Sequence, residues 1–394
     1  MDSIDVGLVL NLHQPAANLD ELLDHNEWEA RELLWALDRI PRSLWEDEDV
    51  GRVHLSLSGS LLETLADPRF QARVYGVVDC GSLLWHLQNT RTIDLLGTAY
   101  YHPVLPLIPP HDREEHIARW LGLGRHLFWR DRFRGFWPPE LGFCMDLVPT
   151  LAGQGYEWVI VDSEHVMPLS PMTWEELRYR PHRARVGDAE VIVVVRDRDL
   201  SNAQESGMEA GWFIEEVRAR TQHCDFPPLV TTATDGDNGG WFRNTTDGAN
   251  FWSSFYRDLV ERVHTGRSSG IRPAFINDYL DRHGAHGWVT IEPGAWNTGE
   301  HHGAGFVQWT GSSAQRDALA RAGRVSEAVQ AGIHMIGNGE GAAGVLEQAR
   351  WRLLRAETSC NFYWGEAWVE RCHQDLDDAE AQLDQALNAY QGVA

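Results

Sequence analysis

The sequence contains no lysine, so all 34 of its basic residues are arginines, and they stand against 58 acidic residues. The formal net charge is -24 at pH 7. A field of that sign repels polyanions, which excludes nucleic acid and anionic lipid as favoured partners. The charge balance bears on solubility and association and leaves the fold undetermined.

Cysteines and long apolar runs are also scarce. The five cysteines of this 394-residue chain include no Cys-x-x-Cys pair, which predicts reduced thiols in a cytoplasm instead of a disulfide framework or a zinc site. No apolar run approaches the roughly 20 residues of a membrane span, and residues 1–5 lack the basic segment that begins a signal peptide. We therefore expect a cytoplasmic protein with no membrane partner, and the sequence leaves its oligomeric state open.

Tryptophan, by contrast, is abundant, with 18 residues. Most of them are expected to pack in the core, but four lie beside polar residues at predicted strand ends: Trp137, Trp241, Trp296 and Trp364. A flat aromatic face stacks on the apolar C–H face of a sugar ring, whose hydroxyls then need hydrogen bonds. We interpret these four tryptophans as candidate contacts to a carbohydrate substrate.

Short, continuously apolar runs alternate with segments of helical spacing over most of the chain. The predicted strands cover residues 6–12, 53–58, 93–98, 132–137, 157–162, 191–195, 229–234 and 288–291. Such alternation is typical of βαβ units and a parallel sheet. Because polar and aromatic residues repeatedly follow the ends of these runs, we predict an α/β fold of the (β/α) barrel type, with its site at the strand carboxyl ends.

The pattern changes near residue 312, after which alanine, leucine and glutamate recur at helical spacing. The predicted helices cover residues 314–332, 342–358 and 366–390, with no strand between them. The sequence therefore predicts two regions. The first is a catalytic barrel over residues 1–310, and the second is an α-helical region over residues 311–394 that packs on the barrel.

Two acidic residues follow predicted strands in distinctive surroundings. Glu140 lies in the sequence Phe-Trp-Pro-Pro-Glu-Leu-Gly-Phe, residues 136–143, where proline must end the strand because it lacks the N–H of a sheet ladder. Asp235 precedes glycines that let a ligand approach the backbone closely. Asp235-x-Asp237-x-Gly239 also resembles the start of a calcium loop, but the glutamate expected at the twelfth position is missing.

Carboxylates at neighbouring strand ends favour glycoside chemistry. In a retaining mechanism the two groups lie ~5–5.5 Å apart, one acting as nucleophile and the other as acid and then base. An ionised Glu140 would attack the anomeric carbon while a protonated Asp235 passes its proton to the leaving oxygen. Mutual repulsion raises one of the two pKa values and so supplies the acid. The positions of the two residues in the sequence do not determine the distance between their carboxyl groups.

Further polar residues follow the other predicted strands and are expected at the same mouth of the barrel. The candidate substrate-binding residues of this kind are His13, Glu63, His102, Asp162, His165 and Arg196. His13 fits a capped structural residue as well as a substrate contact. Glu63 fits either a hydrogen bond to sugar hydroxyls or the orientation of His13. The sequence leaves both alternatives open.

Four of these segments, in this order, resemble the first four motifs of glycoside hydrolase family 57. They are residues 13–15 (His-Gln-Pro), 59–63 (Gly-Ser-Leu-Leu-Glu), 137–140 (Trp-Pro-Pro-Glu) and 235–241 (Asp-Gly-Asp-Asn-Gly-Gly-Trp). Residues 100–109, 196–202 and 358–365 are also similar to members of the family. The chain departs from the usual motifs at Asp237 in place of glutamate, at Gly239 in place of an aromatic residue, and at Cys360 in place of aspartate.

The resemblance implies a retaining enzyme on a (β/α)7-type distorted TIM-like barrel with a helical C-terminal region. It implies that Glu140 is the nucleophile and Asp235 the acid/base, with no cofactor and no metal. The implied substrate is an α-1,4-linked glucan or maltooligosaccharide, and the implied activity is that of an α-amylase or a 4-α-glucanotransferase. The chain is shorter than typical branching enzymes of the family, which disfavours branching.

Two other functions remain open at the level of sequence. A metal-dependent carbohydrate deacetylase on a similar barrel would need an aspartate and a histidine pair at ligand spacing. The available pairs, His111 with His116 and His301 with His302, do not fit one face of a helix. A non-catalytic glucan-binding protein on the same barrel would not need both carboxylates, and both are present.

Overall fold

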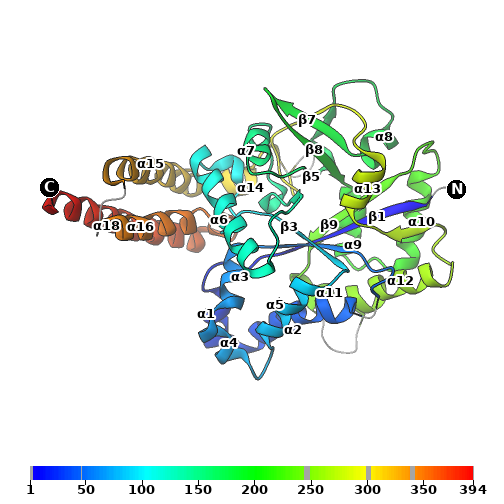
Figure 1. Ribbon diagram of the computed structural model, residues 1–394, viewed down its shortest axis with the longest axis horizontal. Coiled ribbons are helices and arrows are strands. Elements are labelled where there is room, and N and C mark those ends of the chain that lie inside the picture. Colours follow the sequence, from blue (N-terminus) through cyan, green and yellow to red (C-terminus); the bar gives the residue numbers. More distant parts are fainter. Residues whose placement is uncertain (1–2, 46, 244–248, 299–302, 338–341, 394) are drawn as a thin grey trace.

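The computed structural model describes residues 3–45, 47–243, 249–298, 303–337 and 342–393. It contains a barrel of strands surrounded by helices, and a group of long helices that projects from one side of the barrel (Figure 1). The first strand begins at the far side of the barrel, and the last helix ends at the tip of the projection (Figure 1). Among these residues, no helix combines the length and apolar character that crossing a membrane requires.

Seven parallel strands form the barrel, in the order β3-β2-β1-β9-β8-β5-β4. They are β1 (Ile4–Leu12), β2 (Val53–Leu57), β3 (Ile93–Leu96), β4 (Gly135–Phe136), β5 (Trp158–Asp162), β8 (Ala189–Arg196) and β9 (Leu229–Asp235). A parallel bridge between Gly97 and Phe136 joins the two outer strands. β8 and β9 meet at one register pair, Arg196 with Thr231, so the barrel is nearly closed. This arrangement confirms the predicted (β/α)7-type barrel.

The strand sequences explain how the barrel packs. β1 is buried along its length except at Ile4, as expected for a strand covered on both faces. β4 is only 2 residues long, because Pro138 and Pro139 follow it closely and cannot continue the ladder. Gly135 is required here, since a Cβ at this position would lie 2.2 Å from the Trp158 ring.

The remaining strands lie outside the seven-strand cycle. β10 (Ile271–Pro273) pairs with β1, and β7 (His182–Val186) forms an antiparallel pair with β8 that we did not predict. The predicted run 288–291 does form a strand, β11 (Val289–Ile291), but it pairs with β6 (Val166–Pro168) in a separate two-stranded sheet. The eighth run is therefore not a barrel strand. So short an apolar run does not indicate which sheet it joins.

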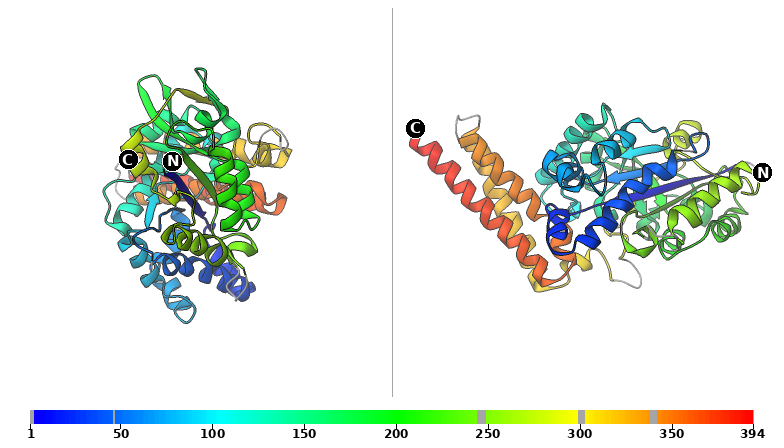
Figure 2. Two further views of the ribbon diagram at one scale, coloured as in Figure 1. Left: turned by 90° about the vertical axis from the view of Figure 1, so that its right-hand side faces the viewer. Right: turned by 90° about the horizontal axis from the view of Figure 1, so that it is seen from below.

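Helices cover the outside of the barrel (Figures 1 and 2). They are α1 (Asn18–His25), α2 (Glu27–Leu44), α3 (Gly59–Ala66), α4 (Pro68–Val74), α5 (Cys80–Asn89), α6 (Pro110–Phe128), α7 (Leu147–Gly153), α8 (Trp174–Tyr179), α9 (Arg198–Glu205), α10 (Ala210–Thr221), α11 (Gly239–Arg243), α12 (Arg257–His264), α13 (Ile276–His283) and α14 (Val307–Thr310). Short 3-10 turns, η1 (Leu105–Leu107), η2 (Pro139–Leu141) and η3 (Ser163–His165), and one π-helical turn, η4 (Phe251–Tyr256), complete this region.

The projecting helices, which we call the helical arm, are α15 (Ser313–Ile336), α16 (Ala342–Ala356), α17 (Cys360–Tyr363) and α18 (Glu366–Val393). The three long helices agree with the predicted segments and share a separate apolar core that includes Leu353 and Leu376. One end of the arm meets the barrel and the rest projects away (Figures 1 and 2). At the junction, Arg119 of α6 lies 2.6 Å from the Glu347 carboxylate.

Candidate active site

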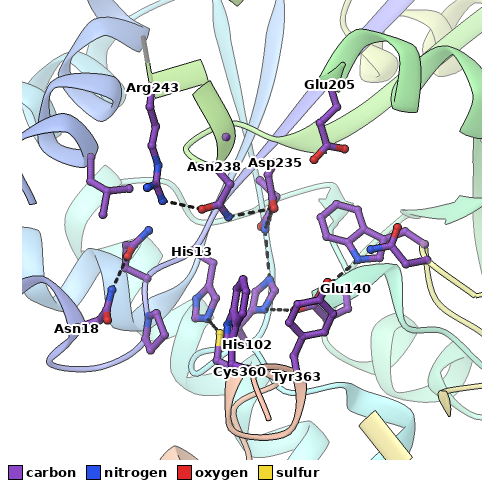
Figure 3. A pocket seen from close by; sticks show the side chains of 18 of the residues that line it. His13, Asn18, His102, Glu140, Glu205, Asp235, Asn238, Arg243, Cys360 and Tyr363 are labelled. Atoms are coloured by element: carbon purple, nitrogen blue, oxygen red, sulfur yellow. Dashed lines mark hydrogen bonds and ion pairs between the residues drawn. The ribbon is translucent and has the colours of Figure 1, made fainter. Parts of the chain in front are cut away.

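A cavity of about 600 Å³ opens at the carboxyl ends of the barrel strands. Its walls come from β1 and β9, from η2, from helices α1, α2 and α11, and from α17 of the helical arm (Figure 3). The polar and aromatic residues that line it include Asn11, His13, His102, Glu140, Arg196, Glu205, Asp235, Asn238, Arg243, Trp296, Tyr363 and Trp364. Glu140 and Asp235, the two predicted catalytic residues, therefore face one cavity from different elements.

Glu140 is held by the turn η2 in an unusual backbone conformation. Its φ is 58° and the φ of Leu141 is 49°, and the left-handed region costs a residue with a side chain roughly 1–2 kcal/mol. Such strain persists only where surrounding contacts impose it. Here the Ser359 hydroxyl donates to Glu140 Oε1 at 2.7 Å, and the Trp296 indole N–H donates to Oε2 at 3.1 Å. The carboxylate is thus fixed from two other segments of the chain.

The same contacts act on the ionisation of Glu140. Burial raises its pKa above the ordinary value, while the hydrogen bonds from Ser359 and Trp296 lower it. Hydrogen bonds to a carboxylate favour its charged form. The two hydrogen bonds therefore offset part of the cost of burying the charge of Glu140.

Asp235 ends strand β9 and lies directly opposite Asn11 of β1 in the sheet register. Asn11 Nδ2 donates to Asp235 Oδ1 at 3.2 Å, and Asn238 Nδ2 donates to Oδ2 at 3.1 Å. Burial and, second, the negative charge of Glu140 raise the pKa of Asp235 to about 6. The two carboxyl groups thus interact electrostatically across the cavity, and their surroundings are different.

Two histidines lie close to the carboxylates, with His102 beside Glu140 (Figure 3). The rings of His13 and His102 stack with centroids 4.1 Å apart and planes 9° apart. Burial lowers the pKa of His102 to about 3 and that of His13 well below its ordinary value, so both are neutral. The Asn11 amide N–H2 lies 3.4 Å from His102 Nε2. Because this amide nitrogen only donates, Nε2 must accept the hydrogen bond. The His102 proton then lies on Nδ1, 3.5 Å from Glu140 Oε1.

Several predicted substrate-binding residues line the cavity together with the carboxylates. These are His13, His102, Arg196, Trp296 and Trp364. Arg196 is buried, and its guanidinium donates to Asp162 at 2.6 Å. Trp364 lies at the mouth with 59% of its surface exposed, its ring perpendicular to that of Tyr363. Stacking of sugar on Trp296 and Trp364 stays a prediction that this arrangement permits.

The other predicted residues do not line the cavity. Trp137 is buried behind Trp296, with ring centroids 5.7 Å apart. Asp162 lies beneath the cavity, where it binds Arg196 and Arg198.

His165, Glu63 and Trp241 are also placed away from the cavity surface. His165 Nε2 lies 2.9 Å from the Ala295 carbonyl, where it supports the segment that carries Trp296. Glu63 is exposed on α3, and Trp241 is on α11. A position after a strand predicts the correct end of the barrel, but it does not determine which way a side chain points.

Sequence reasoning missed several polar residues of the cavity, among them Asn11, Asn18, Glu205, Asn238 and Arg243. Asn11 did carry a signal, because it is a polar residue within the otherwise apolar run of β1. The others lie on helices or turns where polar residues are common, so the sequence contains no comparable signal for them.

The described part of the chain holds no group of three or more histidine, cysteine, aspartate or glutamate residues that could bind a metal ion. His111 and His116 instead contact Ser326 and Glu357 at the junction with the helical arm. His301 and His302 lie outside the described residues.

The chain is similar to an α-amylase from Pyrococcus horikoshii, with 28% identity over 187 residues that make up 47% of this chain and 26% of that protein. It is also similar to a 4-α-glucanotransferase from Thermococcus kodakarensis, with 26% identity over 201 residues, or 51% of this chain and 28% of that protein. The match thus spans little more than a quarter of the length of these curated relatives.

Among solved structures, the fold is similar to that of a 4-α-glucanotransferase from Thermococcus litoralis (TM-score 0.69, 19% identity, 96% of this chain and 60% of that chain). It is also similar to a branching enzyme from Pyrococcus horikoshii (TM-score 0.72, 15% identity, 98% of this chain and 88% of that chain). At these identities the likeness establishes a shared fold. The model of glycosyl hydrolase family 57 matches residues 11–292, a stretch that includes Glu140 and Asp235. The chain belongs to glycosyl hydrolase family 57.

Proposed function

We propose that the protein is a retaining enzyme that cleaves α-1,4-glucans, as an α-amylase or a 4-α-glucanotransferase. The observation that carries this proposal is the pair Glu140 and Asp235, which face one cavity from separate elements and have different hydrogen-bond partners. Family membership supports the reaction type. The names of the relatives, which are α-amylases and 4-α-glucanotransferases, support the substrate class.

In the first step, Glu140 attacks the anomeric carbon and forms a glycosyl ester, while the bond from that carbon to the leaving oxygen breaks. Asp235 gives its proton to this oxygen. In the second step, an acceptor hydroxyl gives a proton to Asp235 and attacks the same carbon, which releases Glu140. Water as acceptor gives hydrolysis, and a sugar hydroxyl gives transfer.

The electrostatics of the cavity suit this change of role. The charge of Glu140 is one of the two main causes that raise the pKa of Asp235 to about 6. Ester formation removes that charge, so the pKa of Asp235 falls in the intermediate. Asp235 is therefore a better acid before the ester forms and a better base afterwards.

The cavity also suits a neutral, hydroxyl-rich ligand. Trp296 and Trp364 offer aromatic faces, and the neutral His13 and His102 offer hydrogen-bonding nitrogens without a charge. Tyr363 and Trp364 at the mouth are well placed to exclude water from an acceptor subsite. The extent of that exclusion decides between hydrolysis and transfer.

The test is product analysis with maltoheptaose for the wild type, Glu140→Ala and Asp235→Ala. We expect the wild type to yield shorter maltooligosaccharides, or a ladder of longer and shorter ones if it is a transferase, and both variants to be nearly inactive. Trp129→Ala, at a tryptophan with 84% exposure, serves as a control. A wild type inactive on α-1,4-glucans of several lengths would refute the substrate class, and an active Glu140→Ala would refute the mechanism.

A second substrate separates the two roles. A 4-nitrophenyl maltooligosaccharide has a leaving group that departs without a proton, so it needs the acid less than maltoheptaose does. We expect Asp235→Ala to retain much more of its activity on this substrate than on maltoheptaose, and Glu140→Ala to lose activity on both. The opposite pattern would exchange the two assignments.

A further inference from the structure

Arg243, the last residue of α11, is clamped at the edge of the cavity by three acceptors. Its Nε donates to the Asp237 carbonyl at 2.6 Å, Nη1 to Glu29 of α2 at 3.3 Å, and Nη2 to Asn238 Oδ1 at 2.9 Å. The side chain is 24% exposed. Its guanidinium is therefore held in one place by contacts from two elements, and one of its donors is committed to Asn238 (Figure 3).

This contact determines how the Asn238 amide is turned. A guanidinium only donates hydrogen bonds, and an amide has one accepting oxygen and one donating N–H2. Because Arg243 occupies the Asn238 oxygen, the N–H2 must face Asp235, whose Oδ2 it meets at 3.1 Å. Asn11 donates to the other oxygen. Both oxygens of Asp235 thus face donors, an environment that favours the carboxylate over the neutral acid.

We propose that Arg243 is a positioning residue that locks the Asn238 amide, and through it sets the pH range over which Asp235 works as acid and base. Without Arg243, the amide is free to turn its oxygen toward a protonated Asp235 and accept its proton in a hydrogen bond. The neutral acid is then stabilised and Asp235 ionises at higher pH. The inference rests on the proposed function, because it concerns the ionisation of Asp235, the acid of that reaction.

Other titratable groups also act on Asp235 from the surrounding elements. They are Glu140 of η2, Glu205 of α9, Asp237 after β9, and Cys360 and Tyr363 of α17. All of these are neutral or anionic, whereas Arg243 is a cation that lowers the pKa of Asp235. Substitution of Arg243 leaves these groups in place, so a change in pH dependence reports on Arg243 and the amide it holds.

The test is the pH dependence of kcat/KM, measured with maltoheptaose, whose leaving oxygen needs a proton from the acid. The alkaline limb of this profile reports the pKa of the catalytic acid in the free enzyme. In Arg243→Gln we expect the limb to move up by about one pH unit, the size expected for one lost hydrogen bond to a charged group. Arg267→Gln, at an arginine with 58% exposure, is the matched control and should leave the limb unchanged.

A double-mutant cycle shows whether Arg243 acts through Asn238. If it does, Arg243→Gln shifts the limb less in an Asn238→Ala background than in the wild type. An equal shift in both backgrounds would mean that only the charge of Arg243 matters and would overturn the proposal. An unmoved limb in both Arg243→Gln and Asn238→Ala would overturn it as well, even if kcat fell. The proposed function fails separately, when the wild type has no turnover or Glu140→Ala remains active.

Discussion

Asp237 offers a direct test of the electrostatics of the cavity, because it is a buried acid with one unsatisfied oxygen. Gln14 donates to its Oδ2 at 2.9 Å, whereas Oδ1 is buried without a hydrogen-bond partner among the described residues. Burial and the charge of Asp235 raise the pKa of Asp237 from 3.8 to about 7. The native state therefore binds the proton more tightly than the unfolded chain does.

The sign of the effect on stability follows from that difference. Below about pH 4 the side chain is protonated in both states, and above about pH 7 it is ionised in both. As the pH rises between these values, the ionised side chain is less favourable in the native state, so the free energy of unfolding falls. A difference of about three pKa units corresponds to at most roughly 4 kcal/mol at pH 8. Asp237→Asn keeps the size of the side chain and does not titrate, so it removes this pH-dependent cost.

The measurement is urea unfolding of wild type and Asp237→Asn at pH 4, 6 and 8. We expect the variant to gain stability relative to the wild type as the pH rises, by up to a few kcal/mol at pH 8, and to gain nothing at pH 4. Asp199→Asn, at an aspartate with 75% side-chain exposure, controls for the general effect of removing one charge from an acidic protein. A difference between wild type and Asp237→Asn that is equal at all three pH values would refute the reasoning.

Two further predictions concern catalysis. Ser359→Ala removes the 2.7 Å donor to Glu140, so the pKa of Glu140 should rise. The acidic limb of the kcat/KM profile should then move to higher pH, and kcat/KM on that limb should fall about tenfold. An unmoved acidic limb would contradict this role for Ser359. Trp364→Ala removes an aromatic face at the cavity mouth, so KM for maltoheptaose should rise by about tenfold with kcat nearly unchanged. A fall in kcat at constant KM would instead place this tryptophan near the reacting bond.

The sequence was informative where local chemistry dictates the backbone. Continuous apolar runs predicted the barrel strands, and the prolines before Glu140 predicted where its strand ends. The helical spacing of alanine, leucine and glutamate after residue 312 predicted the long helices of the arm within a few residues. These features depend on neighbours in the chain, so a pattern of residues is enough to reveal them.

The cavity lining depended on contacts that the sequence does not encode locally. Trp137 and Trp296 are both tryptophans in suitable motifs, yet one is buried in the core and the other binds Glu140. In an extended segment, neighbouring side chains point to opposite faces, so proximity to a strand end cannot separate a core residue from a cavity residue. Arg243 was missed for a similar reason, since its role arises from Asn238 and Glu29, which belong to different elements.

The functional unit crosses the boundary that the sequence suggested between barrel and helices. Ser359 lies between α16 and α17 of the arm, its backbone N–H donates to the His102 carbonyl at 3.0 Å, and its hydroxyl donates to Glu140. The barrel supplies the nucleophile in a strained conformation, and the arm supplies a donor that opposes the desolvation of its charge. Since one ordered hydrogen bond to a carboxylate changes its ionisation by about one pKa unit, the position of the arm on the barrel bears directly on the reactivity of Glu140.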